Sequence, residues 1–123
     1  MSRRRFEPKH TDDAIVGTIY LLHFERPIGD TGHVRNYAQH YLGWAAPGGL
    51  EARLAAHRAG TGARITAFLA KSGIAFHVVK TWEGDRYQER RMKRAGHHAK
   101  RRCPLCNPAL LTAELEELVD ESA

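Results

Sequence analysis

GTIYLLHF, residues 17–24, is rich in β-branched and aromatic residues, a composition that predicts a β-strand. With the preceding AIV, this strand is expected to span residues 14–24. YAQHYLGW at 37–44 has the same character and predicts a second strand. Residues 25–36 between them, ERPIGDTGHVRN, are rich in turn-forming residues and are expected to form a long loop. A hairpin is the simplest connection, so the two strands predict part of a small antiparallel sheet.

Helices and one further strand are expected in the rest of the chain. APGGLEARLAAHRAG at 46–60 begins with Pro and Gly, continues with good helix formers and ends at Gly60. The later elements are expected at 62–73 (helix), 74–82 (strand), 83–96 (basic helix), 97–108 (loop) and 109–123 (helix). The order β-β-α-α-β-α indicates an α+β fold, in which helices flank a three-stranded, mostly antiparallel sheet.

The charge is unevenly distributed along the chain. The 19 Lys and Arg residues exceed the 14 Asp and Glu residues to give a net charge of +5. Five of the acids lie in the last fourteen residues, which leaves nineteen bases against nine acids, a net +10, in residues 1–109. Such a field suits a polyanion such as a nucleic acid, although a solvated basic face is the simpler alternative. The main phosphate-binding surface is expected at Arg86, Arg90, Arg91, Lys93, Arg94, Lys100, Arg101 and Arg102.

The length of 123 residues suits a single domain with a real core. We expect a basic N-terminal arm at 1–14, a globular domain at 15–109 and an acidic C-terminal helix at 110–123. No apolar run approaches the roughly 18 residues that a membrane span needs, and the basic N-terminus has no apolar segment behind it. A cytoplasmic protein with no membrane partner is therefore expected.

Four short stretches resemble the GIY-YIG endonuclease superfamily in content and order. They are TIY at 18–20, YLG at 41–43, LEARLAAH at 50–57 and YQERRMK at 87–93. The resemblance covers roughly residues 15 to 95. It implies that the two tripeptides form adjacent strands, that the first helix presents an arginine, and that a later helix presents a carboxylate which holds a divalent metal ion.

The resemblance implies a role for each matching residue in the hydrolysis of DNA, double-stranded or branched. Tyr20 and Tyr41 match the two motif tyrosines, and Tyr41 would remove the proton from the attacking water. Arg53 would hold a phosphate with its planar, permanently charged guanidinium. His57 would orient Tyr20 or share in proton transfer. Glu89 would hold Mg²⁺ or Mn²⁺, which keeps several waters when bound by one carboxylate.

Two alternatives to an endonuclease remain open from the sequence. A nucleic-acid-binding module of the same fold, without cleavage, is favoured by the absence of a polar residue directly after YLG, at 44–46. A small zinc-stabilised interaction protein is the other. Each site residue also has a plain structural explanation, such as an ordinary ion pair between Glu89 and Lys93 on one helix.

The two cysteines, Cys103 and Cys106, have C-x-x-C spacing and indicate a metal site, a redox pair or a turn at a helix end. His97 and His98 lie close in sequence, and together the four side chains could bind a structural zinc ion. A distant histidine such as His10 or His77 is an alternative ligand. Asn107 is a loose match to an asparagine of the family. His23, in the first strand, has no role in any of these interpretations.

Overall fold

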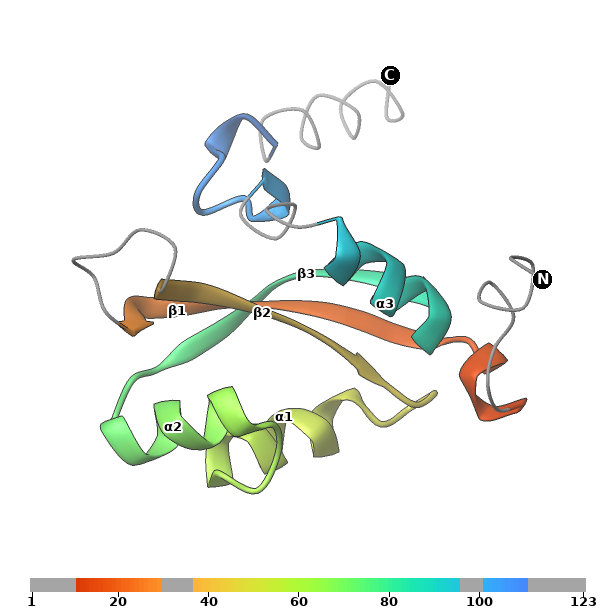
Figure 1. Ribbon diagram of the computed structural model, residues 1–123, viewed down its shortest axis with the longest axis horizontal. Coiled ribbons are helices and arrows are strands. Elements are labelled where there is room, and N and C mark those ends of the chain that lie inside the picture. Colours follow the sequence, from red (N-terminus) through yellow and green to blue (C-terminus); the bar gives the residue numbers. More distant parts are fainter. Residues whose placement is uncertain (1–10, 30–36, 96–100, 111–123) are drawn as a thin grey trace, which may run out of the picture.

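The computed structural model describes residues 11–29, 37–95 and 101–110 (Figure 1). A short 3-10 helix, η2, precedes three strands and three helices. Their bounds are η2 Thr11–Ala14, β1 Gly17–Gly29, β2 Tyr37–Ala45, α1 Leu50–Ala59, α2 Arg64–Ser72, β3 Phe76–Gly84 and α3 Arg86–Arg94. The predicted α+β class, with helices on a three-stranded antiparallel sheet, is confirmed.

β1 is the central strand of the sheet, which has the order β2-β1-β3 with both neighbours antiparallel. Residues 19–22 of β1 are completely buried because helices cover both faces of the strand. The register places Tyr20 opposite Gly43 of β2, and His23 opposite His40 of the same strand. These two cross-strand pairs position the two clusters of polar residues described below.

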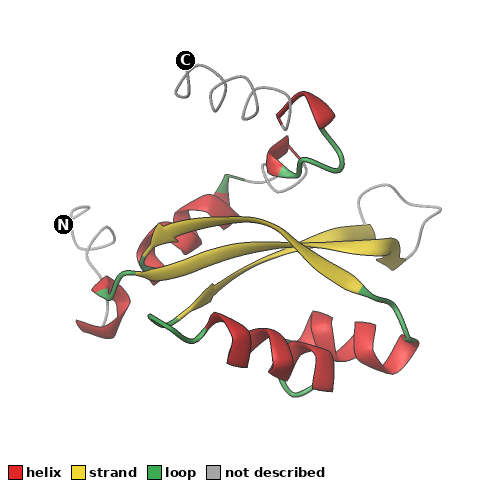
Figure 2. Ribbon diagram, turned by 180° about the vertical axis from the view of Figure 1, so that it is seen from behind, coloured by secondary structure: helices red, strands yellow, loops and turns green. Residues whose placement is uncertain are grey.

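The two faces of the sheet have separate cores. α1 and α2 lie on one face, whereas α3 and residues 101–110 lie on the other (Figure 2). Alternate residues of β1 contribute to each core, because successive side chains of a strand point to opposite faces. The first core includes Tyr20, Leu22, Phe24 and Leu69. The second includes Ile19, Leu21, Leu42 and Cys103.

The predicted ends of the first strand are wrong. β1 begins at Gly17, three residues later than expected, and continues through Pro27 to Gly29. Pairing with β2 is irregular between His23 and Ile28, so Pro27, which has no N–H to donate, lies where the ladder is interrupted. Residues 25–29 of the predicted loop at 25–36 are therefore strand, and residues 30–36 lie outside the described part.

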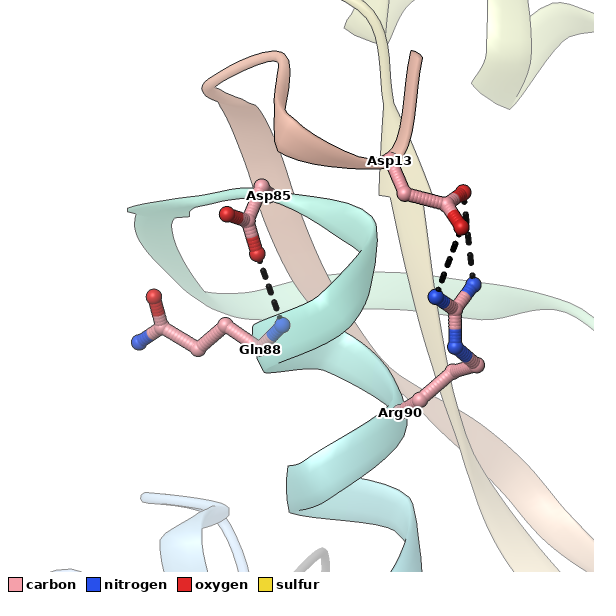
Figure 3. Close-up of polar contacts among 4 residues, drawn as sticks. All are labelled: Asp13, Asp85, Gln88 and Arg90. Atoms are coloured by element: carbon pink, nitrogen blue, oxygen red, sulfur yellow. Dashed lines mark hydrogen bonds and ion pairs between the residues drawn. The ribbon is translucent and has the colours of Figure 1, made fainter. Parts of the chain in front are cut away.

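The helix ends follow local chemistry. Gly60 and Gly73 close α1 and α2 with φ of 81° and 69°, in the left-handed region that glycine tolerates. α3 begins later than predicted, because Asp85 is its N-cap and accepts a hydrogen bond from the Gln88 N–H at 2.8 Å (Figure 3). Glu83, expected in the first turn of this helix, belongs to β3 instead.

η2 packs against α3 through an ion pair. Asp13 is buried, and its carboxylate oxygens accept hydrogen bonds from Arg90 Nη2 at 2.9 Å and Nη1 at 3.5 Å (Figure 3). The last four residues of the predicted basic arm thus form a defined element. Residues 1–10 of that arm, and the predicted acidic helix from residue 111, lie outside the described residues. No helix in the described part of the chain is long and apolar enough to cross a membrane.

Candidate active site and metal-ligand group

Five residues expected at a common site come from four different elements and lie together. Tyr20 of β1 and Tyr41 of β2 have ring centroids 6.3 Å apart. His57 of α1 lies 5.7 Å from the first ring and 5.6 Å from the second. The guanidinium of Arg53, one turn before His57, interacts with both tyrosines, and Glu89 of α3 lies near enough to affect the ionisation of Tyr20.

Gly43 explains why the second tripeptide ends in glycine. It lies directly opposite Tyr20 in the sheet. A Cβ at this position would lie 2.4 Å from the hydroxyl oxygen and ring of Tyr20 and 2.8 Å from the ring of Tyr41. Only a residue without a side chain therefore allows the two rings to take these positions.

A chain of hydrogen bonds orients Tyr20. Its hydroxyl lies 2.5 Å from Nε2 of His57, whose Nδ1 lies 2.8 Å from the hydroxyl of Thr66. The Thr66 hydroxyl donates its single proton to the Ala63 carbonyl at 2.8 Å. We therefore assign the His57 proton to Nδ1, so that Nε2 accepts the hydrogen bond from Tyr20. The contact from the Ala63 N–H to Nδ1 is much longer, 3.4 Å, and carries little weight.

Burial controls the ionisation of this pair. It lowers the pKa of His57 to about 4, and the positive charge of Arg53 adds to the effect. Burial also raises the pKa of Tyr20 to about 12, helped by Tyr41 and Glu89 and opposed by Arg53. At neutral pH the pair is consequently a protonated phenol and a neutral imidazole.

Tyr41 is more accessible than Tyr20 and lies beside an ion pair. Tyr41 is half-buried, whereas Tyr20 is completely buried. Lys93 Nζ lies 5.1 Å from the centre of the Tyr41 ring and 2.9 Å from Glu89 Oε1. The ion pair expected on the basic helix is thus present. Glu89 itself is only 8% exposed, whereas the lysine side chain is 46% exposed.

Several of the predicted phosphate-binding bases already have partners. Arg90 pairs with Asp13, and Lys93 with Glu89. The guanidinium carbon of Arg86 lies 4.8 Å from the centre of the Trp44 ring. These three cations are therefore partly committed to contacts within the protein.

The remaining bases are more available. Arg91 of α3 and Arg102 line one pocket of about 420 Å³, and Arg102 also stacks over Trp82. Arg94 and Arg101 are exposed. Lys100 lies outside the described residues.

A second group of polar residues lies on the opposite face and could hold a metal ion. Its members are His23, His40, Cys103 and Cys106, whose ligand atoms all lie within 4.8 Å of one another. His23 Nδ1 is 3.2 Å from His40 Nε2 and 3.4 Å from Cys103 Sγ, and Cys106 Sγ is 3.4 Å from His40 Nε2. Burial, together with the nearby His77, lowers the pKa of His23.

The sequence identified only the cysteine half of this group. The predicted ligands His97 and His98, and the alternative His10, lie outside the described residues. The other alternative, His77, contacts Glu25 at 3.2 Å. His23 and His40 were missed because they are distant in sequence from the cysteines and meet only through the hairpin register. One feature of the sequence could have indicated them: His23 lies in a predicted strand that is mostly apolar, and no interpretation of the sequence explained it.

Asn107 helps to shape the cysteine turn. Its N–H donates to the Cys103 carbonyl at 2.9 Å, which closes the turn that carries both thiols. Its match to an asparagine of the GIY-YIG family stays a prediction.

Comparison with protein-family models, with curated proteins and with solved structures gives no match for this chain. The resemblance of the four short stretches to the GIY-YIG superfamily therefore stays a prediction. Any functional assignment depends on the residues and contacts described above.

Proposed function

We propose that the chain is a divalent-metal-dependent endonuclease of the GIY-YIG type, which hydrolyses phosphodiester bonds in DNA. The observation that supports this proposal most is the convergence of Tyr20, Tyr41, Arg53, His57 and Glu89. These residues are spread over 70 positions and four elements. Ordinary core packing gives no reason for two phenols, a guanidinium, an imidazole and a carboxylate to meet.

The contacts suggest different roles for the two tyrosines. Tyr20 is fully buried and its pKa is raised to about 12, so it is poorly suited to accept a proton from water. We assign it a positioning role with His57. Tyr41 is half-buried and lies next to Arg53, and it is the better candidate for the base. Arg53 would hold the phosphate oxygens and stabilise the charge that develops on them.

Glu89 is suited to hold the divalent ion. Its carboxylate is a hard oxygen ligand beside Lys93, which in turn lies 5.1 Å from the centre of the Tyr41 ring. Mg²⁺ commonly binds through one or two carboxylates and completes its shell with water. When bound, the ion supplies charge stabilisation at the scissile phosphate. Lys93 would have to release Oε1, which its partly exposed side chain permits. We also expect a separate zinc ion, with a structural role, at the group of His23, His40, Cys103 and Cys106.

A non-cleaving nucleic-acid-binding module is the second candidate. The 2.9 Å ion pair with Lys93 favours it, because this pair already neutralises the carboxylate that a metal ion would need. The residues after YLG, 44–46, also offer no polar side chain except the indole of Trp44, which donates to the Gly84 carbonyl.

Nicking of supercoiled plasmid with Mg²⁺ or Mn²⁺ tests the proposal. The native chain should convert supercoiled to open-circular DNA, and EDTA should stop the reaction. Glu89→Gln and Arg53→Lys should each lower the rate at least 100-fold, because they remove the metal ligand and the bidentate phosphate contact. Glu83→Gln is the matched control, because Glu83 is an exposed glutamate on β3, and it should cleave at the native rate.

Lys93→Met separates the two candidate functions. In an endonuclease this variant frees Glu89 and should cleave at a lower Mn²⁺ concentration than the native chain. DNA binding without cleavage by the native chain and by Lys93→Met, with every metal tried, would rule out the endonuclease in favour of the binding module.

A further inference from the structure

Little of the surface of residues 101–110 is buried against the sheet. Cys103 is the one residue of this described segment that is buried, and Leu105 is 60% exposed. One buried cysteine offsets little of the conformational entropy that is lost when ten residues are ordered. A metal ion held by the two cysteines would add strongly to the contacts that fasten the segment.

Three short contacts of His23 involve the same atom, Nδ1. Its Nδ1 atom lies 3.2 Å from His40 Nε2, 3.4 Å from Cys103 Sγ and 3.8 Å from Cys106 Sγ. A ring nitrogen carries one proton or one lone pair, so it cannot hydrogen-bond to three neighbours at once. Three such contacts on one atom instead indicate a common centre between the four side chains.

The distances match the edges of a tetrahedral metal site. Metal–nitrogen bonds of about 2.0–2.1 Å and metal–sulfur bonds of about 2.3 Å give nitrogen–nitrogen edges of about 3.3 Å and nitrogen–sulfur edges of about 3.6 Å. The nitrogen–nitrogen distance is 3.2 Å, and three of the four nitrogen–sulfur distances are 3.4, 3.4 and 3.8 Å. These four of the six edges agree with the expected lengths to within a few tenths of an ångström, and the remaining two are no longer than 4.8 Å.

The ligand chemistry selects zinc. Two thiolates and two imidazoles in a tetrahedron are a common structural set for this ion. On binding, both thiols release their protons to solvent, and the two thiolates balance the 2+ charge of the metal. All four positions are taken by protein ligands, which is typical of a structural site and leaves no position for a substrate.

We propose that a zinc ion bound by His23, His40, Cys103 and Cys106 fastens residues 101–110 to the β1–β2 hairpin. The two histidines are opposite each other in the hairpin, and the two cysteines flank a turn closed by the Asn107 N–H. Arg101 and Arg102 directly precede this turn, so the ion also fixes the position of two bases. The inference rests on this cluster alone and holds whether or not the chain cleaves DNA.

Metal content and cobalt spectra of the tag-free full chain test the ligand set. The native chain should contain one zinc ion, and its Co²⁺ form should show the intense d–d bands of tetrahedral cobalt together with thiolate-to-cobalt charge transfer. Cys106→His keeps four ligands, so it should retain the metal with about half of the charge-transfer intensity. A native chain without stoichiometric zinc, or an octahedral cobalt spectrum, would overturn the proposal.

Histidine variants test whether His23 and His40, rather than other histidines of the chain, bind the zinc ion. His23→Ala and His40→Ala should each lower zinc affinity at least 100-fold. His77→Ala is the matched control, since His77 is opposite His23 on β3, and it should keep native affinity. The double variant His97→Ala/His98→Ala should also keep it. If the double variant loses zinc and His23→Ala retains it, then His97 and His98 are the ligands and the proposed ligand set is wrong.

Hydrogen exchange tests whether the metal fastens the segment. The Asn107 amide, bonded to the Cys103 carbonyl at 2.9 Å, should exchange at least tenfold faster after a strong chelator removes the metal. Amides in the centre of β1 should stay protected and serve as the internal reference. Equal protection of Asn107 with and without metal would contradict the fastening role even if zinc binds.

Discussion

Tyr20 and His57 have opposite pKa shifts for a single physical reason. Burial disfavours the charged form of each group, so the pKa of the phenol rises and the pKa of the imidazole falls. The pair is thus locked in its neutral form over a wide pH range. A neutral, hydrogen-bonded Tyr20 is a fixed element of the candidate site, and for this reason the proposed mechanism gives the role of base to the more accessible Tyr41.

The low pKa of His57 predicts that acid destabilises the fold. The folded pKa is about 4 and the ordinary value is 6.5, so between these values the unfolded chain binds more protons. The contribution of neutral His57 is complete above pH 6.5 and decreases as the pH falls toward 4, by a total of about 3 kcal/mol. Urea unfolding of the native chain and of His57→Gln, at pH 7 and pH 4.5, measures this difference.

The native chain should lose more stability between these two pH values than His57→Gln, in which position 57 cannot titrate. Other titrating groups, including the metal-ligand group, are shared by both chains. If both chains lose the same stability, or if the imidazole resonance of His57 titrates near pH 6.5, then folding does not change the pKa of His57.

Gly43→Ala should destabilise the protein by about 1–3 kcal/mol, as overpacking of a core does. The added Cβ would lie 2.4 Å from the phenol of Tyr20, within a sheet where neither backbone can move far. Chemical denaturation of Gly43→Ala, Tyr20→Ala and the double variant measures the coupling. If the clash is the cause, Gly43→Ala costs little in the Tyr20→Ala background, whereas an unchanged cost would place the strain elsewhere.

At the scale of elements, β1 links the two sites because its alternate residues face different helices. Tyr20 points to α1 and α2, and His23 points to the cysteine turn. A shift of one residue in the register with β2 would exchange these faces and disrupt both clusters. The hairpin register is therefore as important to the candidate site as the side chains themselves.

Short-range signals made much of the fold and of the candidate active site predictable from the sequence. Helix formers ending at Gly60 and Gly73, and the apolar run at 17–24, specify elements through local chemistry. Thr66 could not be foreseen, because its contact with His57 depends on how α1 packs on α2. The partnership of His23 with the cysteines likewise depends on distant pairing, which no spacing in the sequence records.

The ion pair between η2 and α3 predicts unequal roles for two adjacent arginines. Arg90→Ala should cost about 1–3 kcal/mol, because it removes the guanidinium from the buried carboxylate of Asp13. Arg91→Ala is the matched control on an exposed position of the same helix and should cost less than about 0.5 kcal/mol. Thermal and urea unfolding measure both, and similar costs would mean that the Asp13 contact contributes no net stability.

At the scale of the whole molecule, the sheet separates two groups of polar residues. α1 and α2 lie on one face of the sheet and residues 101–110 lie on the other (Figure 1). The two phenols and the imidazole lie with the first core, and the two cysteines of the metal-ligand group lie with the second. α3 contacts β2 and brings Glu89 and Lys93 to Tyr41. It also contributes Arg91 to the pocket that it shares with Arg102. α3 is consequently the element that connects catalysis with phosphate binding in the proposed endonuclease.

This arrangement predicts which bases determine the salt dependence of DNA binding. Each phosphate contact contributes about 0.9 to the slope of log K against log salt concentration on duplex DNA. Arg91→Gln/Arg102→Gln should therefore flatten the slope by about 2, because these two arginines line one pocket between α3 and residues 101–110. Fluorescence anisotropy with labelled duplex, over a series of salt concentrations, measures the slope.

Arg64→Gln/Lys71→Gln is the matched control with the same change in net charge. Both residues are exposed on α2, on the other face of the sheet, and their removal should leave the slope close to its native value. Equal flattening by the two double variants would mean that DNA responds to net charge rather than to this pocket. Flattening by the α2 variant alone would place the phosphates beside α1 and α2, and α3 would then have no part in binding them.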